Sequence, residues 1–99
     1  MYGLLNHMKA ELLYRTKEAY GQGFIEVVIW RVPAPVPPSG RPFKYRLVYV
    51  VDGQRVVGYD NERGKGDHKH LRDREVPYAW ISPKQLMAVF MTDVEDMNQ

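Results

Sequence analysis

Two histidines, His68 and His70, stand one residue apart in the charged segment YDNERGKGDHKH, residues 59–70. On an extended strand, side chains two positions apart project from the same face, whereas on a helix they diverge by about 200°. If this segment is extended, the two imidazoles lie together. Histidine takes up and releases protons near neutral pH because its ordinary pKa is ~6.5. The pair could therefore serve as general acid and general base.

The cations around the histidines favour a phosphodiester as the substrate. Positive charge lowers the affinity for a metal ion and attracts phosphate. Cleavage of RNA needs a base for the 2′-hydroxyl, an acid for the leaving oxygen and cations for the charge that develops on the phosphoryl group. We therefore expect a site that cleaves RNA without a cofactor. Its catalytic residues are His68 and His70, and its phosphate contacts are Lys65, Arg63 and Lys69.

Further residues of this region are expected to support the site. Gly64 and Gly66 bracket Lys65, and glycine lets the backbone adopt positive φ or approach an anion closely, as in a phosphate-binding nest. Tyr59 and Tyr78 are expected to pack at the rim. The supporting set is Tyr59, Asp60, Asp67, Gly64, Gly66 and Tyr78.

A metal-dependent nuclease is one alternative. Two imidazoles on one face could hold a divalent ion together with a carboxylate oxygen. Asp67 has the opposite strand parity from the histidines, so Asp60 is the better third ligand. The surrounding lysines and arginines oppose this alternative, because they repel a cation.

Two non-catalytic interpretations also stay open. Residues 62–75 include five basic and four acidic side chains, which is close to a balanced, solvated surface. Alternatively, the chain is a binding module that docks a partner protein through its basic loop and through Phe43, Tyr45 and Tyr49, which share one strand face.

The bulk composition limits the class of protein. The formal net charge of +2 and the pI of about 8.9 allow local attraction to polyanions without the strong field of a dedicated nucleic-acid binder. The absence of cysteine fits a reducing compartment. We find no export signal and no apolar run of the ~18 residues that a membrane span needs. A cytoplasmic protein without membrane association is expected.

The elements that position the site are mainly strands. Residues 9–17 alternate in polarity except at Leu13, and the turn GQG joins them to the β-rich segment 24–32. Segment 24–32 is apolar on both parities, which predicts a strand covered on both sides. Residues 33–42 form a proline-rich connection. Strands at 43–51 and 54–59 then meet at the hairpin signal Asp52-Gly53.

A helix is predicted after Ser82, because Ser82 suits the N-cap, Pro83 the first turn and Gln85 a capping box. The sequence thus predicts an α+β fold, with an antiparallel meander of about four strands packed against a C-terminal helix. We expect a single domain over residues 1–99, with residues 1–8 as a peripheral or disordered arm.

Several segments carry a family resemblance, in chain order: GFIEVVIWRVP, the proline-rich connection, KYRLVYVVDG, YDNERGKGDHKH, VPYAW and the final helix. From about Leu12 onward they resemble the TumE-like family of bacterial toxin–antitoxin proteins. The most specific part is YDN followed by GKGDHKH, with Lys69 where arginine is common. The resemblance implies a small toxin that a helix-turn-helix antitoxin neutralises by direct binding. An exposed strand edge could pair with that antitoxin or with a second copy in a homodimer.

Overall fold

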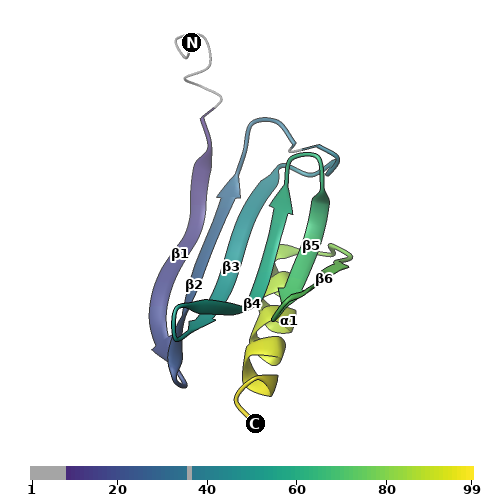
Figure 1. The fold of residues 1–99 in the computed structure, drawn as a ribbon. Helices are drawn as coiled ribbons and strands as arrows, with labels where there is room; N and C mark the ends of the chain where they lie inside the picture. Colours follow the sequence, from purple (N-terminus) through teal and green to yellow (C-terminus); the bar gives the residue numbers. More distant parts are fainter. Residues whose placement is uncertain (1–8, 36) are drawn as a thin grey trace.

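The computed structural model describes residues 9–35 and 37–99; the arm expected at residues 1–8 lies outside them. Six strands precede one helix, in the order β1 (Glu11–Tyr20), β2 (Gly23–Arg31), β3 (Phe43–Val51), β4 (Gln54–Glu62), β5 (Gly66–Leu71), β6 (Arg74–Pro77) and α1 (Pro83–Asp96). The strands form one sheet in chain order, and every neighbouring pair is antiparallel (Figure 1). The α+β class and the meander are confirmed.

The meander has six strands, so the prediction of about four was too low. The extra strands, β5 and β6, come from the charged segment and the residues after it. A turn with Gly64 at φ +87° begins β5, and a second turn with Arg72 at φ +56° ends it. Polar residues lie on both faces of β5, with His68 and His70 on one and Asp67 and Lys69 on the other, so its sequence lacks the alternation of polarity that identifies a half-buried strand.

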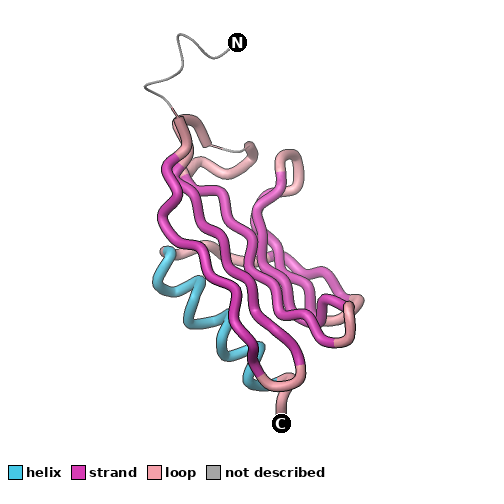
Figure 2. Tube along the Cα trace, turned by 90° about the vertical axis from the view of Figure 1, so that its left-hand side faces the viewer, coloured by secondary structure: helices cyan, strands magenta, loops and turns pink. Residues whose placement is uncertain are grey.

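One face of the sheet carries the hydrophobic core, and α1 lies along that face (Figure 2). Every second residue of the central strands points into the core, as the period of a strand requires. The buried side chains include Ile25, Val27 and Ile29 of β2, Tyr45, Leu47 and Tyr49 of β3, Val57 and Tyr59 of β4, and Leu86, Phe90 and Val94 of α1.

The opposite face of the sheet has no helix over it among residues 9–35 and 37–99 (Figure 2). Phe24, Val28 and Trp30 of β2 lie on this open face and are only half-buried. The expectation that β2 is covered on both sides was therefore wrong. A single helix covers one face only, so the apolar residues on the other face stay partly exposed.

The start of α1 follows the predicted pattern in part. The Oγ atom of Ser82 accepts a hydrogen bond from the backbone N–H of Gln85 at 3.1 Å, as an N-cap does. The side chain of Gln85 does not complete the reciprocal capping box. Its Oε1 atom instead accepts a hydrogen bond from the hydroxyl of Tyr78 at 2.9 Å, which ties the segment after β6 to the helix.

Strand β1 forms an exposed edge of the sheet. The pairing of β1 with β2 shifts between Leu12 and Tyr14, at the residue that interrupts the alternation in the sequence. Leu12 and Tyr14 are 42% and 46% exposed.

Among the described residues, no helix is long and apolar enough to cross a membrane.

The proline-rich connection reaches the turn between β4 and β5. The carbonyl of Pro37 accepts a hydrogen bond from the N–H of Gly64 at 2.9 Å. A Cβ atom on Gly66 would lie 3.2 Å from Cγ of Pro38, so the connection packs closely against the first residue of β5. This contact braces the strand that carries both histidines.

Candidate active site

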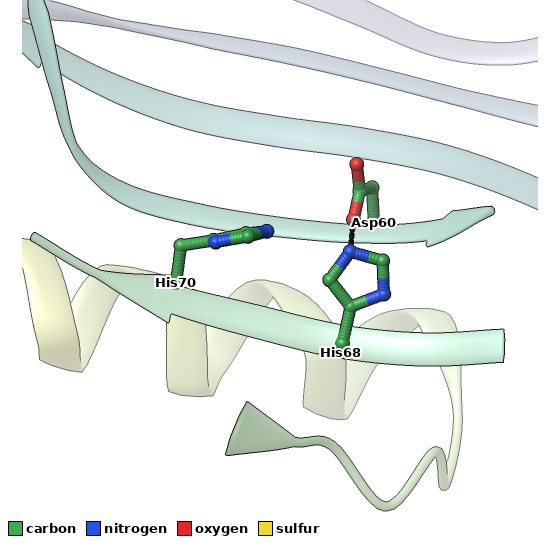
Figure 3. Close-up of side chains that lie close together, drawn as sticks. All are labelled: Asp60, His68 and His70. Atoms are coloured by element: carbon green, nitrogen blue, oxygen red, sulfur yellow. Dashed lines mark ion pairs between the residues drawn. The ribbon is translucent and has the colours of Figure 1, made fainter. Parts of the chain in front are cut away.

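Asp60 and His68 face each other across the β4–β5 pair, on the open face of the sheet (Figure 3). They are directly opposite in the strand register, which places their side chains side by side. Oδ1 of Asp60 lies 2.6 Å from Nε2 of His68, and His68 is only 5% exposed. The carboxylate therefore forms an ion pair with the imidazole whenever the ring is protonated.

The imidazole of His68 has an acceptor beside each nitrogen. Nδ1 lies 3.0 Å from the carbonyl oxygen of Gly66, and a carbonyl only accepts, so Nδ1 carries a hydrogen. Nε2 faces the Asp60 carboxylate. Oδ1 of Asp60 is buried and meets no aligned hydrogen-bond donor among the described residues, so its close neighbour Nε2 is the atom that must balance it. Each ring nitrogen of His68 therefore has an oxygen atom as its close neighbour.

The imidazole of His70 lies beside that of His68. The two ring centroids are 5.0 Å apart, and the rings are nearly perpendicular. Burial lowers the pKa of His70, and the positive charge of Arg55 lowers it further. At neutral pH the imidazole is therefore unprotonated and free to accept a proton. The prediction that strand parity places the two histidines together is confirmed.

Arg55 approaches His70 because Gly58 has no side chain. Gly58 is the strand partner of His70, on the same face. A Cβ atom built on Gly58 would lie 2.7 Å from Cδ of Arg55, so the arginine stem occupies the space that any other residue would fill. Sequence reasoning missed both residues, since the contact depends on the pairing of β4 with β5.

Glu75 joins the site from β6, opposite His70 in the register. Its Oε2 atom lies 3.5 Å from Nε2 of His68 and 3.1 Å from Nζ of Lys65. A hydrogen bond from Lys65 lowers the pKa of Glu75, and the same contact raises the pKa of Lys65. Lys65 is thus held near the histidines, as the sequence led us to expect, but through an acidic residue that the prediction did not include.

The structure separates Lys69 from this cluster. Lys69 lies between the histidines in sequence, so its side chain projects from the opposite, helix-covered face. Its Nζ atom is 3.4 Å from Oδ2 of Asp93 on α1 and 3.3 Å from the hydroxyl of Tyr59. Tyr59 also donates a hydrogen bond to Asp93, and burial raises the pKa of Tyr59. Lys69 is therefore bound beneath the sheet rather than beside the histidines.

Two further predicted residues lie away from the histidine face. Asp67 accepts a hydrogen bond from the Tyr45 hydroxyl at 2.9 Å and forms an ion pair with Arg41. Tyr78 packs edge-on against Tyr59, with ring centroids 5.1 Å apart. The opposite parity predicted for Asp67 is confirmed, and the aspartate joins β5 to β3 instead of holding a ligand.

The glycines of the turn adopt positive φ, at +87° for Gly64 and +79° for Gly66. The backbone N–H of Gly64 donates to Pro37, and that of Lys65 donates to Glu62, each at 2.9 Å. These two donors therefore close the turn, and a phosphate-binding nest is not formed by them. Arg63 is exposed in the same turn.

The ligand atoms of Asp60, His68 and His70 all lie within 4.8 Å of one another, which is compatible with a shared metal ion. The hydrogen bond between Nδ1 of His68 and the Gly66 carbonyl would also orient Nε2 toward such an ion. The cluster therefore has two chemical possibilities, a proton relay or a metal centre. The nearby charges of Arg55 and Lys65 favour the former.

The comparisons with known proteins place the chain in a family. The family model described as Toxin TumE matches residues 6–98, nearly the whole chain, which confirms the resemblance predicted from about Leu12 onward. No curated protein and no solved structure matches the chain. The chain therefore belongs to the Toxin TumE family, whose members are toxins and imply an antitoxin as partner.

Proposed function

We propose that this toxin cleaves RNA at the cluster of Asp60, His68 and His70 on the open face, by acid–base catalysis without a metal. His70 takes the proton of the 2′-hydroxyl, and the resulting oxygen attacks the adjacent phosphorus. The bond from phosphorus to the 5′-oxygen breaks, and His68 donates its proton to that leaving oxygen. The products are a 2′,3′-cyclic phosphate and a 5′-hydroxyl. The observation that carries this proposal is the placement of His68 against Asp60 and beside His70.

The acidic and basic neighbours assign the two proton roles. A carboxylate oxygen of Asp60 lies beside Nε2 of His68 and the Gly66 carbonyl lies beside Nδ1, so we assign His68 the role of the acid. Burial and Arg55 keep the ring of His70 neutral as the base. An acid and a base held side by side are the usual basis of general acid–base catalysis.

The cations near the cluster stabilise the charge that develops on the phosphoryl oxygens. Arg55 lies beside His70, Lys65 reaches the cluster through Glu75, and Arg46 is the strand partner of Asp60 on β3. We assign the electrostatic role to these three side chains, with Arg63 at the end of the hairpin as a further phosphate contact. Lys69 instead holds β5 against α1 through Asp93.

Expression of the toxin without its antitoxin tests this function. The wild-type chain is expected to arrest growth and to deplete cellular RNA. His68→Gln and His70→Gln should each relieve the arrest, because each removes one proton-transfer group while the core on the other face stays intact. Lys84→Gln, a change to an exposed cation on α1, is the matched control and should stay toxic. Equal toxicity of both histidine variants and the wild type would contradict the proposal.

A metal-dependent nuclease is the second candidate. It is favoured by the buried Oδ1 atom of Asp60, which accepts no aligned hydrogen bond from the described residues, and by the closeness of the three ligand atoms. A metal ion bound there would activate water for attack on the phosphodiester. The experiment is elemental analysis of the purified toxin and its activity in excess EDTA. Bound Zn²⁺ or Mn²⁺ together with loss of activity in EDTA would establish this candidate. Activity that persists in EDTA, with no metal found, would exclude it.

A purely non-catalytic module has lost its main support. Tyr45 and Tyr49, expected to dock a partner through an exposed aromatic face, are 2% and 1% exposed beneath α1. Phe43 stacks on Trp80, with ring centroids 5.5 Å apart. If a protein partner binds this toxin, it must use another surface.

We propose that the antitoxin, of the helix-turn-helix class, adds a strand or apolar segment to the edge strand β1. A hollow of about 260 Å³ beside β1 is lined by Leu13, Tyr14, Ile29, Pro83, Lys84 and Met87. Tyr14→Glu should abolish neutralisation by the antitoxin and leave toxicity intact, whereas Glu18→Gln on the same strand should change neither. Normal neutralisation of Tyr14→Glu, or a homodimer of the toxin alone that Tyr14→Glu dissociates, would refute this assignment.

A further inference from the structure

We propose that the open face of the sheet binds single-stranded RNA, guiding it from β1 across β2 and β3 into the histidine cluster. This inference rests on the proposed function, because it names the substrate class of the same site. It follows from three features of the open face: a row of cations, half-buried aromatic rings, and the absence of a covering helix among the described residues.

The first feature is a continuous row of side chains that the strand register places on the open face. Arg15 of β1 is opposite Val28 of β2, and Val28 is opposite Arg46 of β3. Arg46 is opposite Asp60, which is opposite His68. Neighbouring strands lie ~4.8 Å apart, so the row from Arg15 to His68 spans about 19 Å. A bound chain can therefore contact cations on β1 and β3 and still reach the histidines.

Further cations flank this row. Lys17 of β1 and Lys44 of β3 lie on the same face as Arg15 and Arg46, and all four side chains are exposed. On β1 to β3, Glu26 is the acidic residue of this face, opposite Lys17. The net charge of the whole chain is small, but the cations gather on the surface that leads to the site. A polyanion matches this surface, whereas an apolar protein segment does not.

The second feature is a pair of aromatic side chains between the cations. Trp30 is opposite Lys44 and lines a shallow hollow of about 250 Å³ together with Val28, Lys44, Tyr45 and Arg46. Phe24 lies under Lys17, whose Nζ atom is 4.7 Å from the ring centroid. Aromatic rings that stack on bases, set among cations that hold the backbone, are the components of a surface for single-stranded nucleic acid.

The same components exclude a duplex as the preferred ligand. The bases of an RNA helix are stacked on one another and are not available to a tryptophan ring, whereas unstacked bases can lie against it. The attack on phosphorus also needs a 2′-hydroxyl that can align with the leaving oxygen, which a flexible single strand allows. We therefore expect single strands to bind more tightly than duplexes of the same sequence.

The test is the affinity of the full-length toxin for fluorescent RNA oligonucleotides whose 2′-hydroxyls are all methylated. Such probes cannot be cleaved through the 2′-oxygen, so binding is separated from catalysis. Trp30→Leu should weaken binding of the single strand about tenfold or more, as expected for the loss of base stacking. Arg46→Gln should weaken it and reduce the salt dependence by about 0.7 in log–log slope. Arg74→Gln, an exposed cation of β6 opposite Leu71 and on the parity of the covered face, should bind like the wild type.

The outcomes separate this inference from the proposed function. If the variants weaken binding as expected but unmethylated RNA is never cleaved, the binding face stands and the catalytic proposal fails. If RNA is cleaved while Trp30→Leu and Arg46→Gln bind like the wild type, the binding face is refuted and catalysis stands. Equal affinity for a duplex would also refute it. Circular dichroism of Trp30→Leu and Arg46→Gln checks that both variants are folded.

Discussion

Asp60 and His68 lie opposite each other on β4 and β5, with Oδ1 of the aspartate 2.6 Å from Nε2 of the histidine. This contact lies on the open face of the sheet (Figure 3). The helix α1 covers the other face (Figure 2), where the hydrophobic core lies. The chemistry of the site can therefore be altered with little effect on the packing of α1. The predictions below use this separation.

Asp60→Asn should reduce turnover without weakening RNA binding. The change removes the negative charge beside Nε2 but keeps the hydrogen bond from Nδ1 to Gly66, so the protonated ring loses one of its two stabilising partners. We expect kcat to fall by about 10²-fold or more, within the range for loss of acid–base catalysis, with KM nearly constant. Asp73→Asn, an exposed change in the β5–β6 turn, is the control. A rise in KM with constant kcat would show that Asp60 serves binding instead.

The pH dependence should reveal the lowered pKa of His70. A base must be unprotonated, so activity is expected to rise with pH through a pKa below the ordinary ~6.5 of histidine. Arg55→Gln removes a positive charge beside the ring and should move that limb toward higher pH. NMR titration of the His70 ring in both proteins measures the shift directly. An unchanged His70 pKa in Arg55→Gln would contradict the role of the arginine.

The same pKa shift has a consequence for stability. The unfolded chain binds a proton at His70 more readily than the folded one, since burial and Arg55 oppose the charge. The contribution of His70 to the free energy of unfolding is therefore constant above about pH 6.5 and decreases as the pH falls from there through the lowered pKa. Urea unfolding of the wild type and of His70→Gln should be compared at pH 7.5 and pH 5. The free energy of unfolding should decrease less in the variant than in the wild type. Equal losses would argue against the shift.

Gly58→Ala tests how the arginine reaches the histidine. The new methyl group would meet Cδ of Arg55 at 2.7 Å, and because that contact is with a flexible side chain, the arginine is expected to move away. The fold should persist, and the pKa of His70 should rise as in Arg55→Gln. A folded Gly58→Ala protein in which the pKa of His70 does not rise would contradict the placement of Arg55 by Gly58.

Lys69→Gln should affect stability and not RNA binding. Lys69 lies on the covered face with Asp93 and Tyr59, so its loss leaves a half-buried carboxylate without its cation. We expect a loss of about 1–3 kcal/mol in the free energy of unfolding, measured by urea titration, with the affinity for methylated single-stranded RNA unchanged. Weakened RNA binding with unchanged stability would place Lys69 among the phosphate contacts after all.

The sequence was sufficient for the features that depend on local periodicity. Parity on an extended backbone placed His68 with His70 and set Asp67 apart, and the capping signals located the start of α1. The same parity rule, applied to Lys69, points to the covered face. The prediction of Lys69 as a phosphate contact rests on its position between the two histidines in sequence. Adjacent residues of a strand point to opposite faces, so that position does not bring the side chains together.

Features that depend on pairing between strands could not be predicted. Arg55 and Glu75 come to the histidines because β4 and β6 flank β5 in a particular register. Strand β5 could not be recognised as a half-buried strand, because polar side chains lie on both of its faces. His68 points to the open face and Lys69 to α1. Strand β2 is apolar on both faces, so its sequence alone suggests that both are covered. The structure has a single helix over one face, which leaves the other face open.

Metal-free cleavage through the 2′-oxygen is tested by incubating the toxin, in EDTA, with a single-stranded RNA whose cleavage site has been mapped. The comparison is the same RNA with one 2′-deoxynucleotide at that site. We expect cleavage of the all-ribose RNA to a 2′,3′-cyclic phosphate and a 5′-hydroxyl, and no cleavage at the deoxy position. Cleavage at the deoxy position, or 5′-phosphate products that disappear in EDTA, would contradict it.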